Sequence, residues 1–197
     1  MLFDKPKTST AMEMLDKFAV RELIEFERFC RDNALWDQMM LCYATESRVK
    51  TSWYDGDGRG FVIASSRMKT VAPHKMNNTL VWLNGDRAVA VAMACIQSRK
   101  DFDGRWYDLS SYVRLVYTVV KEDQNWLIAS LDAIYEKDCL VPAYPEGMEP
   151  PESARPSYAN VISVIGSEGY EMDTTMAGDD RPDIRDALLH DIASWLG

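Results

Sequence analysis

Two histidines, His74 and His190, are the side chains best suited to moving a proton at neutral pH in this 197-residue chain. The ordinary pKa of histidine is about 6.5, so a neutral imidazole can take up a proton and return it without a cofactor. His74 follows Pro73 at the start of an apolar segment, which is also a common place for a surface histidine. Asp32 stands before Asn33, and that dipeptide by itself is typical of a turn or a helix end.

The sequence lacks the motifs of several other kinds of chemistry. It contains no H-E-x-x-H or C-x-x-C spacing, no P-loop, no G-x-G-x-x-G fingerprint and no G-x-S-x-G elbow. We therefore expect no metal and no cofactor. The four cysteines lie in apolar stretches, so we expect buried, reduced thiols of the kind found in cytoplasmic proteins. They are Cys30, Cys42, Cys95 and Cys139.

The formal net charge of −9 is concentrated at the C-terminal end. Residues 1–145 carry 19 Lys and Arg against 20 Asp and Glu, whereas residues 146–197 carry 3 against 11. No cluster of basic residues is present, so we expect neither nucleic acid nor an anionic membrane as a partner. No apolar run reaches the roughly 20 residues of a membrane span, and the N-terminus lacks the apolar centre of a signal peptide. These features predict a cytoplasmic globular protein.

Helical periodicity marks the first third of the chain. Apolar residues recur every three or four positions from residue 15 to residue 30, and charged residues occupy the opposite side. The apolar set is Leu15, Phe18, Leu23, Phe26, Phe29 and Cys30, and the charged set is Lys17, Arg21, Glu25 and Arg28. A second, short helix is expected over residues 35–43 and a third over residues 60–71, with a strand at residues 48–54 between them.

Four strand candidates follow, at residues 74–83, 87–100, 105–120 and 125–136, and turn sequences separate them. Helices followed by hairpin-linked strands predict an α+β fold with one curved antiparallel sheet. Beyond Cys139 the chain becomes proline-rich, and an amphipathic helix is expected over residues 182–196. We therefore divide the chain into a domain at residues 1–140 and a connector with a helical extension at residues 141–197.

Residues 10–140 resemble the NTF2-like superfamily and, within it, the SnoaL-like branch. The resemblance rests on FCRDNALWDQM at residues 29–39, on His74 opening the first long strand, on NGDRA at residues 84–88 and on NWLIASLD at residues 125–132. It implies a cone-shaped fold, also called cystatin-like, in which a bent sheet surrounds the N-terminal helices and leaves a mostly apolar pocket. The chain looks similar to scytalone dehydratase, lindane dehydrochlorinase, bile-acid dehydratase and the diarylpropane-type lyases that release formaldehyde.

Several dehydrating and dehydrohalogenating members use one Asp–His pair, and the resemblance places Asp32 and His74 at those catalytic positions. A carboxylate bonded to one ring nitrogen fixes the tautomer of the imidazole and stabilises the imidazolium that forms. The same comparison assigns Thr51, Trp53, Tyr112 and Arg114 to the substrate-binding wall. By itself, an arginine in such a strand either points to solvent or is a buried anchor for an anion.

The sequence departs from relatives at two positions. Glu27 stands where some dehydratases carry Tyr or Lys, and the second histidine of scytalone dehydratase is replaced near Ala92. These differences leave proton transfer open but put the scytalone reaction itself in doubt.

The resemblance implies a cofactor-independent lyase of aromatic-compound catabolism, which removes water or a small fragment such as formaldehyde from an aromatic or polycyclic small molecule. In such a reaction His74 takes a proton next to an activating carbonyl group or aromatic ring and returns it to the leaving hydroxyl. The alternatives are an isomerase or polyketide cyclase that uses the same pocket, and a non-catalytic ligand-binding or scaffold module. A homodimer or homotrimer is expected, with the C-terminal extension acting as a lid or a dimer arm.

Overall fold

The computed structural model describes residues 4–144, 146–147 and 155–196. The first helix, α1 (Ala11–Asp32), begins with a capping box in which Thr10 and Glu13 each accept a hydrogen bond from the other's backbone N–H. It ends at Asn33, whose side-chain amide donates to the backbone oxygen of Phe29. Two short helices, α2 (Trp36–Met40) and α3 (Gly58–Ser66), follow on either side of the first strands. Both are shorter than the sequence predicted.

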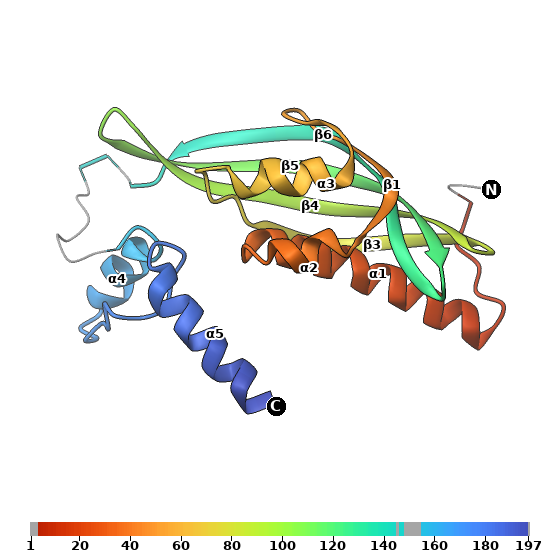
Figure 1. Cartoon of the computed structure of the whole chain (residues 1–197). Helices are drawn as coiled ribbons and strands as arrows, with labels where there is room; N and C mark the ends of the chain where they lie inside the picture. The colour runs from red at the N-terminus through yellow and green to blue at the C-terminus, as the bar shows by residue number, and fades with distance from the viewer. Residues whose placement is uncertain (1–3, 145, 148–154, 197) are drawn as a thin grey trace. The chain divides into compact units, whose positions relative to one another are not determined.

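Six strands form one mixed sheet in the order β2-β1-β6-β5-β4-β3. They are β1 (Tyr43–Lys50), β2 (Asp55–Gly56), β3 (His74–Asn84), β4 (Arg87–Phe102), β5 (Arg105–Glu122) and β6 (Asn125–Pro142). Strand β1 pairs with β6 in parallel, whereas β3 and β4 form an antiparallel hairpin. The expected turns at 84–86 and 101–104 are present, with Gly85 and Gly104 at positive φ. The α+β fold with a curved sheet is therefore confirmed (Figure 1).

The described residues form two compact units. The first lies within residues 1–98 and 108–140, and it holds the three N-terminal helices and most of the sheet. The second lies within residues 99–107 and 141–197, and it holds the tip of the β4–β5 hairpin with α4 (Ala159–Gly166) and α5 (Pro182–Leu196). Residues 145 and 148–154 of the predicted connector lie outside the described residues.

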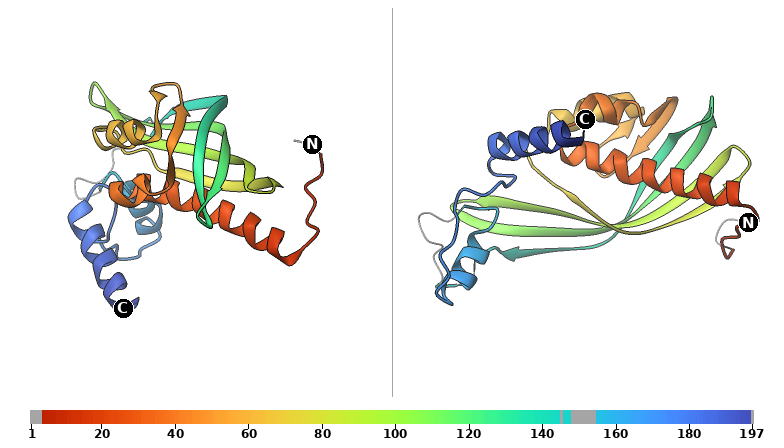
Figure 2. Two further views of the ribbon diagram at one scale, coloured as in Figure 1. Left: turned by 45° about the vertical axis from the view of Figure 1, so that its right-hand side comes forward. Right: turned by 90° about the horizontal axis from the view of Figure 1, so that it is seen from below.

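The interior of the first unit lies between α1 and one face of the sheet, which bends around the helices (Figure 2). The inward row of β4 holds four alanines followed by Ile96, whereas the inward row of β5 holds larger side chains, and both rows follow the two-residue alternation of a strand. The alanines are Ala88, Ala90, Ala92 and Ala94, and the β5 residues are Val113, Leu115, Tyr117 and Val119. Helix α1 places a charged pair, Glu27 and Arg28, against this interior.

The prediction of the buried face of α1 is partly wrong. Leu23 and Cys30 pack inward as expected, but Leu15, Phe18, Phe26 and Phe29 are between 44% and 62% exposed. The buried face instead runs through Val20, Ile24, Glu27 and Arg28, which follow helical spacing equally well. Polar residues can occupy that face because Glu27 and Arg28 satisfy each other's charge.

One cysteine also differs from expectation. Cys30, Cys42 and Cys95 are buried free thiols, but Cys139 is exposed. It lies in the last nine residues of β6, all of which are exposed, so an apolar stretch of sequence does not become core there.

Among the described residues, no helix is long and apolar enough to cross a membrane.

Candidate active site

Asp32 and His74 meet at the junction of two elements. Asp32 is the last residue of α1 and His74 is the first residue of β3, 42 positions further along the chain. The Nδ1 atom of His74 lies 2.8 Å from Asp32 Oδ1, and the backbone N–H of His74 donates to Asp32 Oδ2 at 2.6 Å. The side chains of His74 and Asp32 are only 4% and 13% exposed. The pair is therefore an enclosed acid–base couple.

The hydrogen bonds of this pair determine the tautomer of His74. Because the Asp32 carboxylate can only accept, Nδ1 carries the proton and Nε2 keeps its lone pair. Burial would raise the pKa of Asp32, but the bonds from His74 hold it below its ordinary value. Burial, aided by the charge of Arg28, lowers the pKa of His74 to about 4 against the opposing effect of Asp32. At neutral pH the imidazole is neutral and Nε2 is its basic nitrogen.

A buried arginine stands beside that lone pair. Arg28 Nη1 donates a hydrogen bond to His74 Nε2 at 3.4 Å, on the side away from Asp32, and a substrate must displace this contact before Nε2 can take a proton. The guanidinium is held by Glu27, with Arg28 Nε donating to Glu27 Oε2 at 2.5 Å and Nη2 donating to Oε1. Tyr43 adds a further hydrogen bond to Glu27 Oε1 at 2.8 Å. A fixed positive charge therefore faces the position where His74 would abstract a proton.

Aromatic rings cover the other side of Arg28. Its guanidinium carbon lies 5.7 Å from the centre of the Phe61 ring. Trp53 and Tyr54 each pack against Phe61 with ring centres 5.4 Å apart. Arg28 thus connects the acid–base pair to an aromatic cluster.

Of the four residues predicted to line the substrate-binding wall, one lies in the aromatic cluster, one has a buried hydroxyl oxygen and two lie on the outward face of β5. Trp53 belongs to the aromatic cluster through Phe61, although 41% of it is exposed. The hydroxyl oxygen of Thr51 is buried and has no hydrogen-bond partner, as expected of a group that could bind a ligand. Tyr112 and Arg114, in contrast, lie on the outward face of β5.

The expectation that Tyr112 and Arg114 point inward is wrong. Arg114 forms an exposed ion pair with Glu136, with Arg114 Nε 3.0 Å from Glu136 Oε1. Lys137 lies over the ring of Tyr112, 5.3 Å from its centre. The prediction placed the even-numbered residues of this part of β5 inward, but the odd-numbered residues are buried. An error of one residue in the alternation of a strand moves every side chain to the other face.

The sequence analysis missed two polar residues of the interior, Arg28 and Tyr117. Arg28 was placed on the charged face of α1, and only its position four residues after the buried Ile24 could have indicated otherwise. Tyr117 would have been assigned to the interior if the odd-numbered residues of β5 had been taken as the inward row, because it shares a face with the apolar Val113, Leu115 and Val119.

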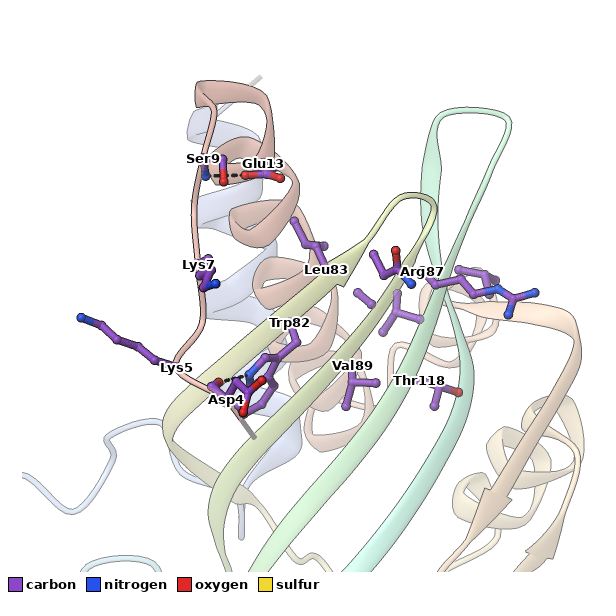
Figure 3. A pocket seen from close by; sticks show the side chains of 14 residues that line it. Asp4, Lys5, Lys7, Ser9, Glu13, Trp82, Leu83, Arg87, Val89 and Thr118 are labelled. Atoms are coloured by element: carbon purple, nitrogen blue, oxygen red, sulfur yellow. Dashed lines mark hydrogen bonds between the residues drawn. The ribbon is translucent and has the colours of Figure 1, made fainter. Parts of the chain in front are cut away.

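A separate cavity of about 790 Å³ lies at the far end of β3 (Figure 3). It is lined by Trp82, Val89 and Thr118 and by the segment that precedes α1, where Trp82 Nε1 donates to the backbone oxygen of Asp4. Trp82 is eight residues from His74 along the strand, which corresponds to about 26 Å. The side chains of Lys5 and Arg87 extend away from each other in Figure 3, so the basic groups at this cavity do not converge.

Among the described residues, no group of three or more histidine, cysteine or acidic side chains could hold a metal ion.

The chain matches none of the known protein-family models. It is 28% identical over 141 residues to a PEP2-like protein of Fusarium vanettenii, a match that covers 67% of this chain and 59% of that protein. The chain therefore spans about three-fifths of the length of this curated relative.

Solved structures show the same fold at low sequence identity. A protein of Novosphingobium aromaticivorans assigned as a scytalone dehydratase is 14% identical, with a TM-score of 0.57 over 72% of this chain and 99% of its own. A hexachlorocyclohexane dehydrochlorinase, LinA type 2, is 10% identical, with a TM-score of 0.57 over 71% and 96% of the two chains. A protein of Nostoc punctiforme with a cystatin-like fold is 15% identical, with a TM-score of 0.53 over 71% and 98%.

The chain therefore has the cystatin-like fold that the sequence predicted.

Proposed function

We propose that this protein is a cofactor-independent lyase that uses Asp32 and His74 to eliminate water, or a small fragment such as formaldehyde, from an aromatic or polycyclic compound. The buried Asp32–His74 hydrogen bond carries the proposal, since it makes Nε2 the basic nitrogen of a neutral imidazole in an enclosed site, where a substrate would take the place of the hydrogen bond from Arg28. Two proteins of similar fold have names that denote related eliminations, a scytalone dehydratase and a dehydrochlorinase.

The dehydration would proceed in two steps. His74 Nε2 first takes the proton from a carbon next to a carbonyl group, and the electrons of that C–H bond move onto the carbonyl oxygen. The imidazolium that forms is stabilised by Asp32 through Nδ1–H. The enolate then expels the β-hydroxyl group, which receives the proton from Nε2 and leaves as water. His74 returns to its neutral form, and no other reactant is consumed.

Arg28 takes the electrostatic role that the sequence analysis gave to Arg114. Its guanidinium is next to Nε2 and is buried, whereas Arg114 is exposed and paired with Glu136. In a dry site, a fixed cation stabilises negative charge that develops on the substrate. In the resting state the same charge opposes protonation of His74.

The aromatic cluster of Trp53, Tyr54 and Phe61 favours a planar, apolar substrate. The cluster is contiguous with Arg28 through Phe61, so a ring packed there would be close to the base.

The proposal is tested with a panel of aromatic β-hydroxy ketones and hydroxymethyl compounds, analysed by mass spectrometry for loss of water or formaldehyde. We expect the unmodified protein to release one of these, and His74→Gln to be slower by about 10²–10⁴-fold, the usual contribution of a positioned acid–base group. The exposed histidine provides the matched control, His190→Gln, which should retain full activity. Equal turnover by His74→Gln would exclude the mechanism. A His74-dependent product of unchanged mass would instead identify an isomerase or cyclase.

A further inference from the structure

Tyr117 is a fully buried residue on the inward face of β5, and its hydroxyl group has no hydrogen-bond partner. The other inward residues of this strand, Val113, Leu115 and Val119, are aliphatic. On the neighbouring strand β4 most inward residues are alanines, which are small enough to pack beside a large ring. Tyr117 thus introduces one polar atom into an otherwise apolar row.

That unpaired hydroxyl is unfavourable for the folded protein. A buried polar group without a partner costs about 1–3 kcal/mol, and most such groups in native structures are satisfied. Phenylalanine would fill nearly the same volume without this penalty. The hydroxyl group is therefore explained if it is satisfied by something that enters the site.

Tyr117 is on the inward face of β5, and Glu27 and Arg28 of the proposed site are buried on α1 in the same interior. Burial raises the pKa of Tyr117, and the charges of Arg28, Glu27 and Asp32 act on the same oxygen. At neutral pH the group is a neutral phenol that can donate one hydrogen bond. Each charged neighbour already has a partner: Glu27 accepts from Arg28 and Tyr43, and Asp32 binds His74. The O–H group of Tyr117 is therefore left for a ligand.

The charges around the site favour an uncharged ligand. Arg28 is neutralised by Glu27, and Arg31 lies 3.6 Å from Asp32, so each of these cations faces a carboxylate. A carboxylate would bring a full negative charge into the resting site, where the charges of these four side chains already balance and the loss of its hydration is costly. A ketone oxygen, in contrast, needs only a neutral donor. Negative charge that develops on the substrate only during the reaction is stabilised by Arg28.

We propose that Tyr117 donates a hydrogen bond to the carbonyl oxygen of a neutral ketone that binds beside His74, and that it thereby selects uncharged ketones over carboxylates. The assignment rests on the proposed lyase function for the role of that oxygen in the reaction. When His74 removes the neighbouring proton, this oxygen takes up the negative charge, and its hydrogen bond from Tyr117 strengthens. A weak base such as His74 requires an acceptor of this kind, because the carbanion must be delocalised.

The test compares Tyr117→Phe with Tyr112→Phe, which removes a hydroxyl from the outward face of the same strand. The probes are 2-acetylnaphthalene as the neutral ketone, 2-isopropylnaphthalene as a hydrocarbon of similar shape and 2-naphthoate as the carboxylate. Affinities are measured by calorimetry, and the carbonyl stretching frequency of bound ketone is measured by infrared difference spectroscopy. The unfolding temperature of Tyr117→Phe should be equal to or higher than that of the unmodified protein, since no hydrogen bond is lost. This measurement separates weaker binding from misfolding.

We expect the unmodified protein to bind the ketone more tightly than the carboxylate. Tyr117→Phe should bind the ketone about fivefold more weakly, the effect of one hydrogen bond of about 1 kcal/mol, and should raise the carbonyl frequency. The affinity of Tyr117→Phe for the hydrocarbon should equal that of the unmodified protein. Tyr112→Phe should match the unmodified protein in ketone affinity and in carbonyl frequency. Ketone affinity and frequency that are identical in Tyr117→Phe, or no ketone binding by the unmodified protein, would overturn the assignment.

Turnover by the unmodified protein and by His74→Gln separates this inference from the proposed function, because ketone binding is measured without turnover. Tyr117-dependent ketone binding together with no His74-dependent turnover would refute the lyase and leave the ketone site in place.

Discussion

Both carboxylate oxygens of Asp32 bind His74, one at the ring nitrogen Nδ1 and the other at the backbone N–H. One side chain therefore fixes the ring of His74 and joins the end of α1 to the start of β3. The contact that selects the tautomer is also a structural contact of the fold, so the base cannot be repositioned without moving the strand.

Asp32→Asn is predicted to impair catalysis by selecting the wrong tautomer. The backbone N–H of His74 requires an acceptor, so the amide oxygen of asparagine would face it and the NH₂ group would face Nδ1. Nδ1 would then lose its proton and Nε2 would gain one, which removes the base. Turnover should fall by about 10²–10⁴-fold, measured by steady-state kinetics.

Nitrogen-15 NMR of the His74 ring provides the direct readout of that change. Asp138→Asn, an exposed substitution on β6, is the control and should leave both measurements unaltered. An Asp32→Asn protein whose Nε2 remains unprotonated while turnover collapses would contradict the tautomer explanation.

The pH dependence of the reaction should reflect a depressed histidine pKa. His74 is active when neutral, and burial lowers its pKa to about 4, so kcat/KM should stay level between pH 7 and 5. Below about pH 4 it should fall tenfold for each pH unit as the base becomes protonated. An acid limb near pH 6.5, the ordinary value for histidine, would show that His74 is solvated in the free enzyme.

The same pKa makes stability depend on pH. In the unfolded chain His74 takes up a proton near pH 6.5, whereas in the folded protein it does so only near pH 4. The stabilising contribution of neutral His74 is therefore complete above pH 6.5, and about 3 kcal/mol of it is lost as the pH falls to 4. Urea denaturation at several pH values should show a smaller loss for His74→Gln over this interval. His190→Gln should follow the unmodified protein.

Arg114 is predicted to contribute little to either activity or stability. Its ion pair with Glu136 is exposed, and such pairs contribute about 0–1 kcal/mol. Arg114→Ala should therefore retain turnover and unfold at nearly the same denaturant concentration. A large loss of turnover in this variant would show that the outward face of β5 participates in the reaction.

The sequence predicted the order of elements and the Asp32–His74 pair because both depend on local signals: turn residues, apolar periodicity and a resemblance carried by short motifs. It did not predict which face of β5 is buried. Tyr112, Arg114, Val116 and Thr118 form one plausible row, and Val113, Leu115, Tyr117 and Val119 form another. Strand alternation alone does not decide between two mixed rows, and packing against α1 selects the second.

Arg28 was missed for a different reason. A charged residue on a helix is usually solvated, and apart from its position four residues after Ile24, nothing local distinguishes Arg28 from Arg21 or Lys17. Its burial depends on Glu27 and Tyr43, and Tyr43 is 16 residues beyond Glu27. The pairing that permits burial is therefore a tertiary property.

The buried pair of Glu27 and Arg28 leads to a last prediction. Glu27→Gln keeps the size of the side chain but removes the charge that compensates Arg28, so an unpaired cation would remain in the interior. Breaking a buried pair in this way costs about 3–5 kcal/mol, which urea denaturation should detect as a lower midpoint. Glu25→Gln is the matched control, because Glu25 is exposed on the same helix and its substitution should change stability by less than about 0.5 kcal/mol. Equal midpoints for the two variants would mean that water reaches Arg28, and a solvated guanidinium could not stabilise charge on the substrate as proposed.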